Sequence, residues 1–449
     1  MKLTVIGTGY VGLVSGVCFA DLGHEVACVD KIAEKITRLE KGEVPIYEPG
    51  LDAILASRTK AGHLSFTTDL TAAMQSTEAV FIAVGTPPHP ETGQADLKYV
   101  YAAAEEIATQ LPSDRFVVVI TKSTVPVGTN REVAEIIAKT NPDTDFAVCS
   151  NPEFLREGAA IEDFMKPDRI VVGVEDERAG TVMAKLYRPL TNRGFPLLQT
   201  DIETAEMIKY ASNSFLATKI AFINEMADIC EHVGANVELV AKGMGMDERI
   251  GDRFLRPGPG FGGSCFPKDA VALAHLAEQA GVSPKIVNTV IEYNLARRES
   301  MADKVIAACG GSVKGKVIAI LGLTFKANTD DMRESPALSI IPKLIAAGAN
   351  IQATDPEGIE NARALLGDEH ISYCKDAYAA LTGAHAACIV TEWADYAGLD
   401  LPKMREVMHT PVLVDLRNLF HPDSVANQGF SYHSIGRQTT GKSCVSDAA

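Results

Sequence analysis

The sequence predicts an α/β protein made of two doubly wound domains, which a long central helix and a helical middle region join. Three observations predict this architecture. Short apolar runs alternate with helical patterns through the first two hundred residues, a helical segment without Gly or Pro runs from about Ile202 to Val233, and a second alternating series begins near Lys314. The length of 449 residues is enough for two or three domains.

The apolar runs are the expected strands. They lack polar alternation, which is typical of strands buried on both faces of a parallel sheet that helices cover. The runs are Leu3–Ile6, Val26–Val29, Val80–Val84, Phe116–Ile120, Phe146–Cys149 and Ile170–Val174 in the first series, and Val317–Leu321, Ile351–Thr354, Ala387–Val390 and Val412–Asp415 in the second.

The two series begin alike, with a basic residue, an apolar strand, a glycine turn, a helix and a strand that ends in Asp. These acids are Asp30 and Asp355. We therefore expect a first domain at residues 1–200, a central helical region with a cysteine loop at 201–300, and a second domain at 301–436. Residues 437–449 show no apolar period and are expected to form a flexible tail.

Composition narrows the classes of partner. The 58 Asp and Glu residues outnumber the 42 Lys and Arg residues, which gives a net charge of −16 and makes nucleic acid and anionic membranes poor partners. The nine Cys residues form no C-x-x-C pair, which is typical of a reducing compartment. We therefore expect a cytoplasmic protein, and no metal site is predicted.

A glycine-rich turn predicts a dinucleotide site. The segment GTGYVG, from Gly7 to Gly12, matches G-x-G-x-x-G directly after a strand and directly before a helical pattern. Gly7 allows the tight turn, Gly9 lets the backbone approach a pyrophosphate, and Gly12 permits close helix–strand packing. Asp30 ends the second strand, where an acid binds ribose hydroxyls and repels the 2′-phosphate of NADP. The predicted cofactor is therefore NAD.

A cysteine after a run of glycines predicts a second site. In PGPGFGGSCFPKD, residues 257–269, the glycines allow the backbone to lie close to a ligand, and Pro267 suits the first turn of a helix. Cys265 is therefore expected just outside a helix N-terminus, where the helix dipole and Lys268 favour the thiolate. Asp269 lies four residues further on, on roughly the same face.

Other polar residues are candidates to serve this thiol. Lys209 and Asn213 are an i, i+4 pair, so one face of the long helix presents a cation and an amide. Glu153 and Glu157 follow a strand end, and Glu153 is a candidate base. Gly85–Pro88 and Ser123-Thr124 follow later strand ends on the same edge, where doubly wound sheets hold ligands.

Several long motifs, in order, resemble one enzyme family over nearly the whole chain. They are GTGYVGLV, STVPVGT, NPEFLREGAAIEDF, KYASNSFLATKIAFINE, GFGGSCFPKD, GLTFKANTDDMRESPAL and VDLRNLF. The chain thereby resembles the nucleotide-sugar 6-dehydrogenases, and GGSCFPKD and FLREGAA resemble the members that act on UDP-glucose. The resemblance implies two Rossmann-like domains, one for NAD and one for the UDP-sugar, and a homodimer formed through the long central helix.

The resemblance also implies a mechanism. Oxidation of UDP-glucose at C6 to UDP-glucuronate removes two hydrides and uses two NAD+, and the thiolate of Cys265 is expected to hold the intermediate first as a thiohemiacetal and then as a thioester. Lys209 and Asn213 are expected to stabilise oxyanion charge. Asp269 and Thr124 are expected to position water, and Glu153 to act as the base for thioester hydrolysis.

The resemblance carries further binding residues over to this chain. For NAD they are Gly7, Gly9, Gly12, Asp30, Lys35, Thr86, Thr124, Glu157, Lys268 and Arg333. For the UDP-sugar they are Phe154, Leu155, Lys209, Asn213, Phe254, Arg256, Gly262, Phe325, Lys326, Arg417 and, from across the dimer, Arg249. Arg256 stands where relatives often have Lys, and Lys35 stands where Arg is common. Both exchanges keep the charge but alter its geometry.

Two alternatives to UDP-glucose oxidation stay open from the sequence. One is a related dehydrogenase that acts on GDP-mannose or on an N-acetylated UDP-hexosamine. The other belongs to a different class, a non-catalytic regulator that binds NAD or a nucleotide sugar and makes no use of Cys265. A single-oxidation hydroxyacid dehydrogenase shares the first domain but not the cysteine loop.

Overall fold

A computed structural model describes residues 1–89 and 93–441 of the chain. The chain divides into two compact units, one formed by Met1–Ser212 with His275–Val282 and the other by Asn213–Ala274 with Ser283–Ala449. Helix α9 (Ile202–Val233) and helix α11 (Phe266–Gln279) each contribute residues to both units. The long helix has the bounds that the sequence predicts.

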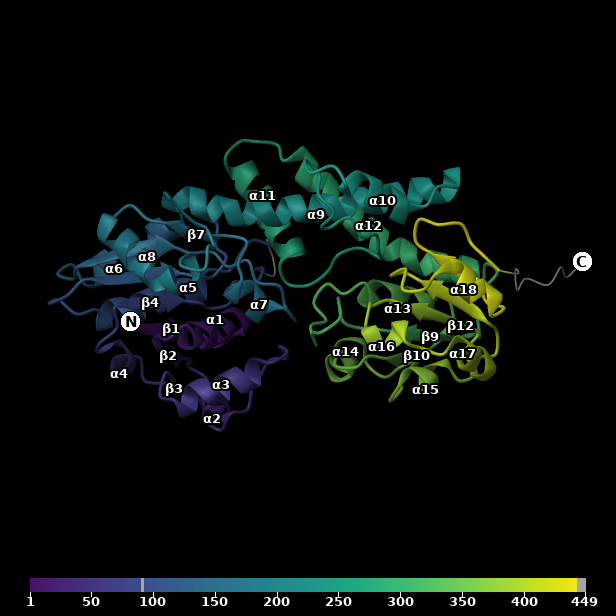
Figure 1. The fold of residues 1–449 in the computed structure, drawn as a ribbon, viewed down its shortest axis with the longest axis horizontal. Coiled ribbons are helices and arrows are strands. Elements are labelled where there is room, and N and C mark those ends of the chain that lie inside the picture. The colour runs from purple at the N-terminus through teal and green to yellow at the C-terminus, as the bar shows by residue number, and fades with distance from the viewer. Residues whose placement is uncertain (90–92, 442–449) are drawn as a thin grey trace, which may run out of the picture. The chain divides into compact units, whose positions relative to one another are not determined.

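The first unit contains an eight-stranded sheet in the order β3-β2-β1-β4-β5-β6-β7-β8 (Figure 1). All neighbouring strands are parallel except β6 and β7, which pair antiparallel at a single position. The strands are β1 (Lys2–Ile6), β2 (Glu25–Val29), β3 (Leu64–Thr67), β4 (Ala79–Ile82), β5 (Val117–Thr121), β6 (Phe146–Ser150), β7 (Ile170–Gly173) and β8 (Leu197–Thr200). The helices that connect them are α1 (Tyr10–Asp21), α2 (Ala33–Glu40), α3 (Leu51–Lys60), α4 (Leu70–Met74), α5 (Lys98–Gln110), α6 (Thr129–Thr140), α7 (Ala160–Met165) and α8 (Glu177–Thr191).

The central strands of this sheet are buried on both faces. Alternate residues of β5 enter two separate apolar clusters: Val118 and Ile120 pack with α1 and α8, and Val117 and Val119 pack with α5 and α6. This two-sided burial is the reason why the strand sequence VVVIT shows no polar alternation.

The second unit contains a six-stranded parallel sheet in the order β11-β10-β9-β12-β13-β14. This order is the same as that of the first six strands of the other sheet. The strands are β9 (Val317–Leu321), β10 (Asn350–Thr354), β11 (Ile371–Tyr373), β12 (Ala386–Ile389), β13 (Val412–Asp415) and β14 (Ser431–Ser434). The helices wholly within the unit are α10 (Val237–Gly245), α12 (Lys285–Ala308), α13 (Ala337–Ala346), α14 (Ile359–Leu366), α15 (Ala377–Leu381), α16 (Ala394–Ala397), α17 (Leu401–Val407) and α18 (Pro422–Asn427).

The fold class and the ten predicted strands are confirmed, with ends that differ by one or two residues. The sequence did not predict β3, β8, β11 and β14, which are the strands at the edges of the two sheets. The predicted division into domains at residues 200, 300 and 436 stays a prediction.

The beginning of the predicted tail is packed rather than flexible. Arg437 is buried, forms an ion pair with Glu238 and donates hydrogen bonds to Ser434 Oγ and Tyr432 Oη. Thr440 and Tyr432 exchange two backbone hydrogen bonds. These contacts correct the prediction for residues 437–441, and the rest of the predicted tail lies outside the described residues.

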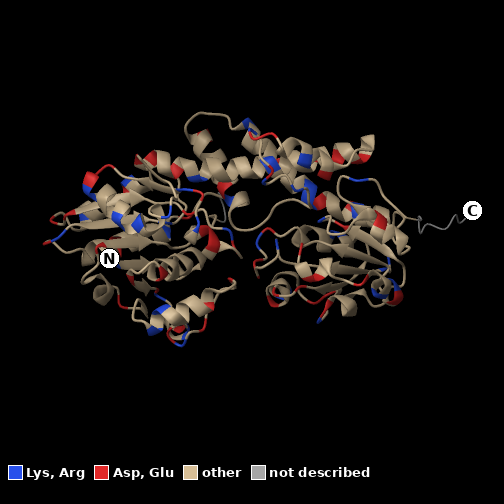
Figure 2. Cartoon of the chain, viewed as in Figure 1, with Lys and Arg blue, Asp and Glu red and all other residues tan. Residues whose placement is uncertain are grey.

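Basic and acidic positions, blue and red in Figure 2, are interspersed along the described part of each unit. Within residues 1–89 and 93–441, no helix combines the length and the apolar character that a membrane span needs.

Candidate dinucleotide, carboxylate and cysteine sites

The turn between β1 and α1 has the geometry of a dinucleotide loop. Gly7 has a φ of +98°, and a Cβ atom there would lie 2.6 Å from the carbonyl oxygen of Ala83. A Cβ atom at Gly12 would lie 1.9 Å from the carbonyl oxygen of Gly7, so α1 packs too closely for any side chain. A Cβ atom at Gly9 would meet nothing within 4 Å. The loop is therefore open at Gly9, in front of the α1 N-terminus, where a pyrophosphate would bind.

Asp30 is held just after β2 as an ionised group. Its Oδ2 accepts hydrogen bonds from the backbone N–H (2.9 Å) and the hydroxyl (2.7 Å) of Thr8, and its Oδ1 accepts one from the N–H of Ile32. Burial raises the pKa of this carboxyl, but these hydrogen bonds and the nearby Lys35 hold it below its usual value. Lys35 Nζ donates a fourth and longer hydrogen bond to Oδ2 (3.3 Å), and the Asp30 side chain is 12% exposed, so a ribose hydroxyl that replaces Lys35 can reach the carboxylate. The residues present thus fit NAD.

The ends of β4 and β5 bring two further predicted residues together. The hydroxyl of Thr86 donates a hydrogen bond to the carbonyl oxygen of Thr124 (3.0 Å). The hydroxyl of the neighbouring Ser123 donates to the carbonyl oxygen of Val84 (2.7 Å). Both contacts lie at the carboxyl edge of the sheet, where the sequence predicts a ligand.

Glu153 and Lys209 form a buried ion pair. Lys209 Nζ lies 2.9 Å from Glu153 Oε1, and the two side chains are 4% and 5% exposed. The N–H of Leu155 donates to Glu153 Oε2 (2.5 Å). Burial raises the pKa of Glu153, but the charge and hydrogen bond of Lys209 outweigh it, so the pKa lies below its usual value. The pair therefore offers a carboxylate base next to an ammonium group.

Phe154 stacks under two cations in the same loop. The guanidinium of Arg169 lies 3.7 Å from the centre of its ring, and Lys209 Nζ lies 5.4 Å from it. Arg169 was not predicted from the sequence, because fifteen positions separate it from Phe154 in the chain and no motif marks it.

A second contact network that the sequence did not reveal anchors the loop after Phe154. The carboxylate of Glu48 accepts hydrogen bonds from the N–H of Gly158 (2.7 Å), the N–H of Ala160 (2.8 Å) and the hydroxyl of Tyr10. Glu48 thus satisfies the N-terminus of α7 with a carboxylate from more than a hundred residues away. No local pattern in the sequence marks such a partner.

Cys265 lies directly before the first residue of α11, as the sequence predicts. Its carbonyl oxygen accepts the N–H of Asp269 (2.9 Å), which closes the first turn of the helix. Its Sγ lies 3.6 Å from the hydroxyl of Ser264, and the residue is partly exposed. The positive end of the helix dipole favours the thiolate form of a cysteine in this position.

The carboxylate of Asp269 contacts two other candidate residues. It is 1% exposed and accepts from Lys268 Nζ (2.8 Å) and from Asn213 Nδ2 (2.6 Å). These contacts bring together three residues that the sequence offers as candidates, and their catalytic roles stay predictions.

Close packing within the protein gives three glycines of the cysteine loop a role that the sequence did not predict. A Cβ atom at Gly262 would lie 2.2 Å from the carbonyl oxygen of Glu334, and one at Gly263 would lie 2.8 Å from the ring of Phe325. At Gly260 it would meet the side chain of Arg298 at 2.8 Å. At these three positions the backbone packs closely against other parts of the same unit, and the predicted approach to a ligand stays a prediction.

Several of the remaining predicted substrate residues contact one another in the second unit, where Phe325 meets both Arg417 and the glycines of the cysteine loop. Arg417 is fixed by the carbonyl oxygens of Val390 (2.7 Å) and Phe325 (3.0 Å) and by an ion pair with Glu392 (3.0 Å). Lys326 Nζ lies 5.4 Å from the ring centre of the adjacent Phe325. The other three arginines predicted to contact ligand or cofactor, Arg249, Arg256 and Arg333, are exposed. Arg249 forms an ion pair with Asp247, and Arg333 forms one with Asp331. Phe254 has a φ of +65° and packs edge-on against Phe266.

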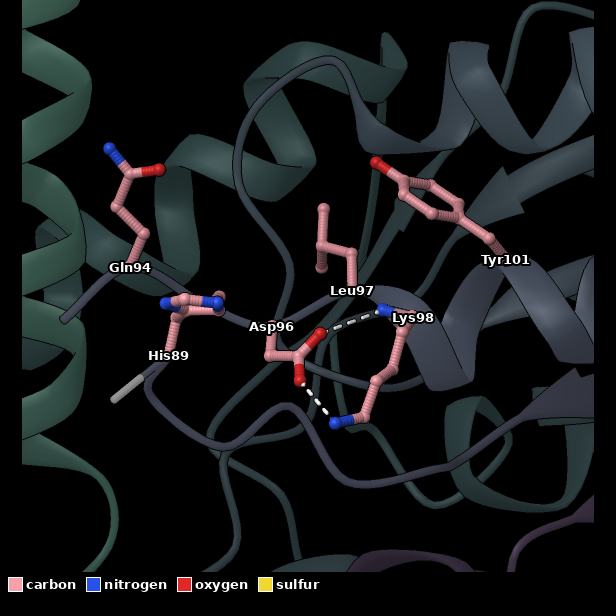
Figure 3. A pocket seen from close by; sticks show the side chains of 7 residues that line it. His89, Gln94, Asp96, Leu97, Lys98 and Tyr101 are labelled. Carbon is pink, nitrogen blue, oxygen red and sulfur yellow. Dashed lines mark hydrogen bonds and ion pairs between the residues drawn. The ribbon is translucent and has the colours of Figure 1, made fainter. Parts of the chain in front are cut away.

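A surface pocket lies over the segment that leads into α5. Figure 3 shows its labelled side chains, with an ion pair of 2.8 Å between Asp96 and Lys98 and with Tyr101 on the adjoining helix. None of the residues that line it belongs to the predicted sites. It borders residues 90–92, which lie outside the described chain.

Three family models match the chain in order. The NAD binding domain of the UDP-glucose/GDP-mannose dehydrogenase family matches residues 1–191, the central domain of that family matches residues 203–296, and its UDP binding domain matches residues 319–422. Together these segments cover most of the chain and include the glycine loop, α9, the cysteine loop and the second sheet.

Individual proteins match over almost the full length. UDP-glucose 6-dehydrogenase of Rhizobium meliloti (strain 1021) is 56% identical over 97% of this chain and 100% of its own length. UDP-glucose 6-dehydrogenase TuaD of Bacillus subtilis (strain 168) is 47% identical over 97% of this chain and 93% of its own length. The solved structure of a UDP-glucose dehydrogenase from Pyrobaculum islandicum is 40% identical, with a TM-score of 0.88 and coverage of 97% of both chains.

Proposed function

The chain belongs to the UDP-glucose/GDP-mannose dehydrogenase family, and we propose that it oxidises UDP-glucose to UDP-glucuronate in two steps through a covalent intermediate on Cys265. It is an NAD-dependent oxidoreductase with a UDP-binding domain. The observation that carries the proposal is the placement of the Cys265 thiol at the N-terminus of α11, beside the buried cluster of Lys268, Asp269 and Asn213.

The position of Cys265 explains why one enzyme performs both oxidations. Bound NAD+ accepts one hydride from C6 in each oxidation. The first oxidation makes an aldehyde, which the Cys265 thiolate adds to, so a C–S bond forms and the aldehyde oxygen takes a proton. Loss of the second hydride, together with the hydroxyl proton, turns this thiohemiacetal into a thioester. Water then breaks the C–S bond and releases the carboxylate and the thiol.

The polar residues supply acid, base and charge for these steps. We assign Lys209 and Asn213 to the oxyanion that develops at C6, since an ammonium group and an amide N–H both stabilise such charge. Glu153 is assigned as the base that activates water for hydrolysis, because its carboxylate is ionised and buried. Asp269 and Thr124 are assigned to positioning water. We also propose that the NAD and UDP-sugar contacts that the family resemblance implies are made in this protein.

The balance of electrons gives the decisive test. The proposal expects two NADH for each UDP-glucose consumed, measured by absorbance at 340 nm together with chromatography of the sugar nucleotides. The Cys265→Ser variant is expected to lose at least about a thousandfold in turnover, as removal of a nucleophile does, yet to bind NAD+ and UDP-glucose. One NADH per sugar with release of free aldehyde contradicts the proposal. Full activity of Cys265→Ser favours the non-catalytic regulator.

The same assay separates UDP-glucose from related sugars. The proposal rests on the full-length similarity to enzymes named for UDP-glucose. We expect kcat/KM for UDP-glucose to exceed the values for GDP-mannose and for N-acetylated UDP-hexosamines. A higher value for either rival changes the substrate but keeps the mechanism.

We also propose that the protein is a homodimer that forms through α9. Phe215, Phe222 and Ile229 are exposed and recur every seven residues along this helix, and Val233 continues the exposed apolar surface. A heptad spacing places these side chains on one stripe, which is typical of helices that pair with a second helix. A cytoplasmic location stays a prediction, which the free thiols of the eight cysteines in the described residues support.

A further inference from the structure

A buried lysine that the proposed mechanism does not use lies at the end of β5. Lys122 directly follows this strand and is 5% exposed. Its Nζ donates hydrogen bonds to Asn151 Oδ1 (3.1 Å) and to the hydroxyl of Tyr187 (3.4 Å). Both of these partners are neutral. A buried ammonium group is costly, so a lysine in such a place calls for an explanation in terms of the charges around it.

The position of the Lys122 ammonium group is fixed from several sides. The Tyr187 hydroxyl donates to Asn151 Oδ1 (2.6 Å), and Asn151 Nδ2 donates to the carbonyl oxygen of Val171 (2.8 Å). These contacts hold the Asn151 oxygen toward the lysine. The backbone N–H of Asn151 donates to the carbonyl oxygen of Thr121, next to Lys122. Asn151 also lies two residues before Glu153, so one short segment connects the lysine to the proposed base.

The charges that act on Lys122 come from two segments of the chain. Burial is the largest influence and lowers the pKa of Lys122 to about 8, while the negative charge of Glu153 opposes it. Lys209 on α9 disfavours the ammonium form, and Cys149 on β6 stays neutral because burial raises the pKa of its thiol. In turn, Lys122 adds to the positive charge that keeps the pKa of Glu153 low, behind the larger effect of Lys209.

We propose that Lys122 is a positioning residue whose charge, together with that of Lys209, keeps Glu153 ionised during thioester hydrolysis. This inference rests on the proposed function, in which Glu153 is the base. Lys209 is also assigned to the oxyanion, so its charge is shared between Glu153 and the substrate in the reaction. Lys122 hydrogen-bonds Asn151 and Tyr187 instead, and its charge stays available to Glu153 throughout the cycle.

The test is the pH dependence of hydrolysis in Lys122→Met, a variant of similar size without the charge. Loss of a nearby opposite charge raises the pKa of a carboxyl by about one unit or more. We therefore expect the acid limb of kcat to move upward by about one pH unit. Near pH 4, where a one-unit difference in the pKa of Glu153 changes its ionised fraction severalfold, acid quenching and intact-protein mass spectrometry should find severalfold more substrate adduct on Cys265 than in the parent enzyme. At pH 7 Glu153 is ionised in both proteins, so the excess should disappear.

Two further variants make the result independent of folding. Asn151→Asp keeps an oxygen acceptor next to Lys122 and introduces a negative charge there, and we expect it to shift the acid limb in the same direction. Lys166→Met removes an exposed lysine of the same unit, which pairs with Glu162, and should leave the profile unchanged.

The possible outcomes distinguish the role of Lys122 from the proposed covalent mechanism on Cys265. If Lys122→Met and Asn151→Asp lower kcat by the same factor at every pH, or leave the profile in place, the role of Lys122 is wrong even though two NADH form per sugar. If no adduct on Cys265 is found in the parent enzyme or in Glu153→Gln at any pH, the covalent mechanism itself fails.

Discussion

Asp30 and Asp355 occupy equivalent places in the two sheets, yet their surroundings differ. Asp30 accepts four hydrogen bonds, two from Thr8 and one each from Ile32 and Lys35, and its side chain is 12% exposed. Asp355 is 3% exposed, and six donors of its own unit hydrogen-bond to its carboxylate, including Trp393 Nε1. A carboxylate has about four acceptor sites, so Asp355 is saturated by the protein. The sequence repeat therefore preserves the turn but not the ribose site.

Two glycines of the dinucleotide loop should respond differently to alanine. At Gly9, whose φ is −70°, a methyl group meets no atom within 4 Å, so Gly9→Ala should change the free energy of unfolding by less than about 1 kcal/mol. The methyl group would nevertheless occupy the open face of the loop, and we expect the Kd for NAD+ to rise by about tenfold or more. Chemical denaturation and NAD+ titration measure the two effects.

Gly12→Ala is the matched counterpart. Its methyl group would lie 1.9 Å from the Gly7 carbonyl oxygen, so α1 has to move away from the loop. Overpacking of this kind costs about 1–3 kcal/mol. We expect Gly12→Ala to lose both stability and NAD+ binding. Equal stability of the two variants contradicts the packing argument, and unchanged NAD+ affinity of Gly9→Ala contradicts the placement of the pyrophosphate.

At the scale of elements, the sequence predicted the interior strands and missed the edges. The ten predicted strands read as apolar runs because both of their faces are buried, as the full burial of β5 shows. The four that were missed are edge strands, and β8 (LLQT) and β14 (SYHS) carry polar residues that an edge tolerates. A search for apolar runs therefore finds only strands whose two faces are both buried.

The same limit applies to the candidate sites. Cys265, Asp269 and Lys268 were predictable because helix geometry relates residues a few positions apart. Glu48 and Arg169 were not, because their contacts with Gly158 and Phe154 depend on how distant segments of the fold come together. The packing of Phe325 and Glu334 against the glycines of the cysteine loop was not predictable for the same reason.

Helix α6 should depend on a carboxylate from α9. Glu206 is 2% exposed and accepts from the N–H groups of Gly128 (2.7 Å) and Asn130 (3.0 Å) at the start of α6, and from Asn130 Nδ2 (2.7 Å). Glu206→Ala leaves these donors buried without a partner, which costs about 1–3 kcal/mol. We expect a correspondingly lower free energy of unfolding in urea.

Glu203 on the same helix provides the control for Glu206. Its carboxylate is partly exposed and pairs with the exposed Arg131. Exposed pairs contribute about 0.2–1 kcal/mol, so Glu203→Ala should destabilise the protein less than Glu206→Ala. Equal losses in the two variants mean that the capping contacts do not stabilise α6.

At the scale of the whole molecule, the two sheets share one strand order but divide the chemistry. The first keeps an open glycine loop with an ionised acid beside it, and the family comparison assigns NAD to this part of the chain. The second has its equivalent acid saturated and is matched by the UDP binding domain. One backbone arrangement thus serves two nucleotides because the side chains at the strand ends differ.

The exposed stripe on α9 gives the last prediction, which concerns assembly. Isolated exposed apolar side chains are ordinary, but a repeat of seven residues aligns Phe215, Phe222 and Ile229 as a continuous surface that water disfavours. Replacing Phe222 and Ile229 together by Glu places two charges in the proposed interface. We expect a mass of about two chains for the parent protein in sedimentation equilibrium and of about one chain for the double variant. Leu365→Glu, at an exposed position on α14, should remain dimeric. A parent protein that sediments as a monomer, or a double variant that still dimerises, shows that this stripe does not hold two copies together.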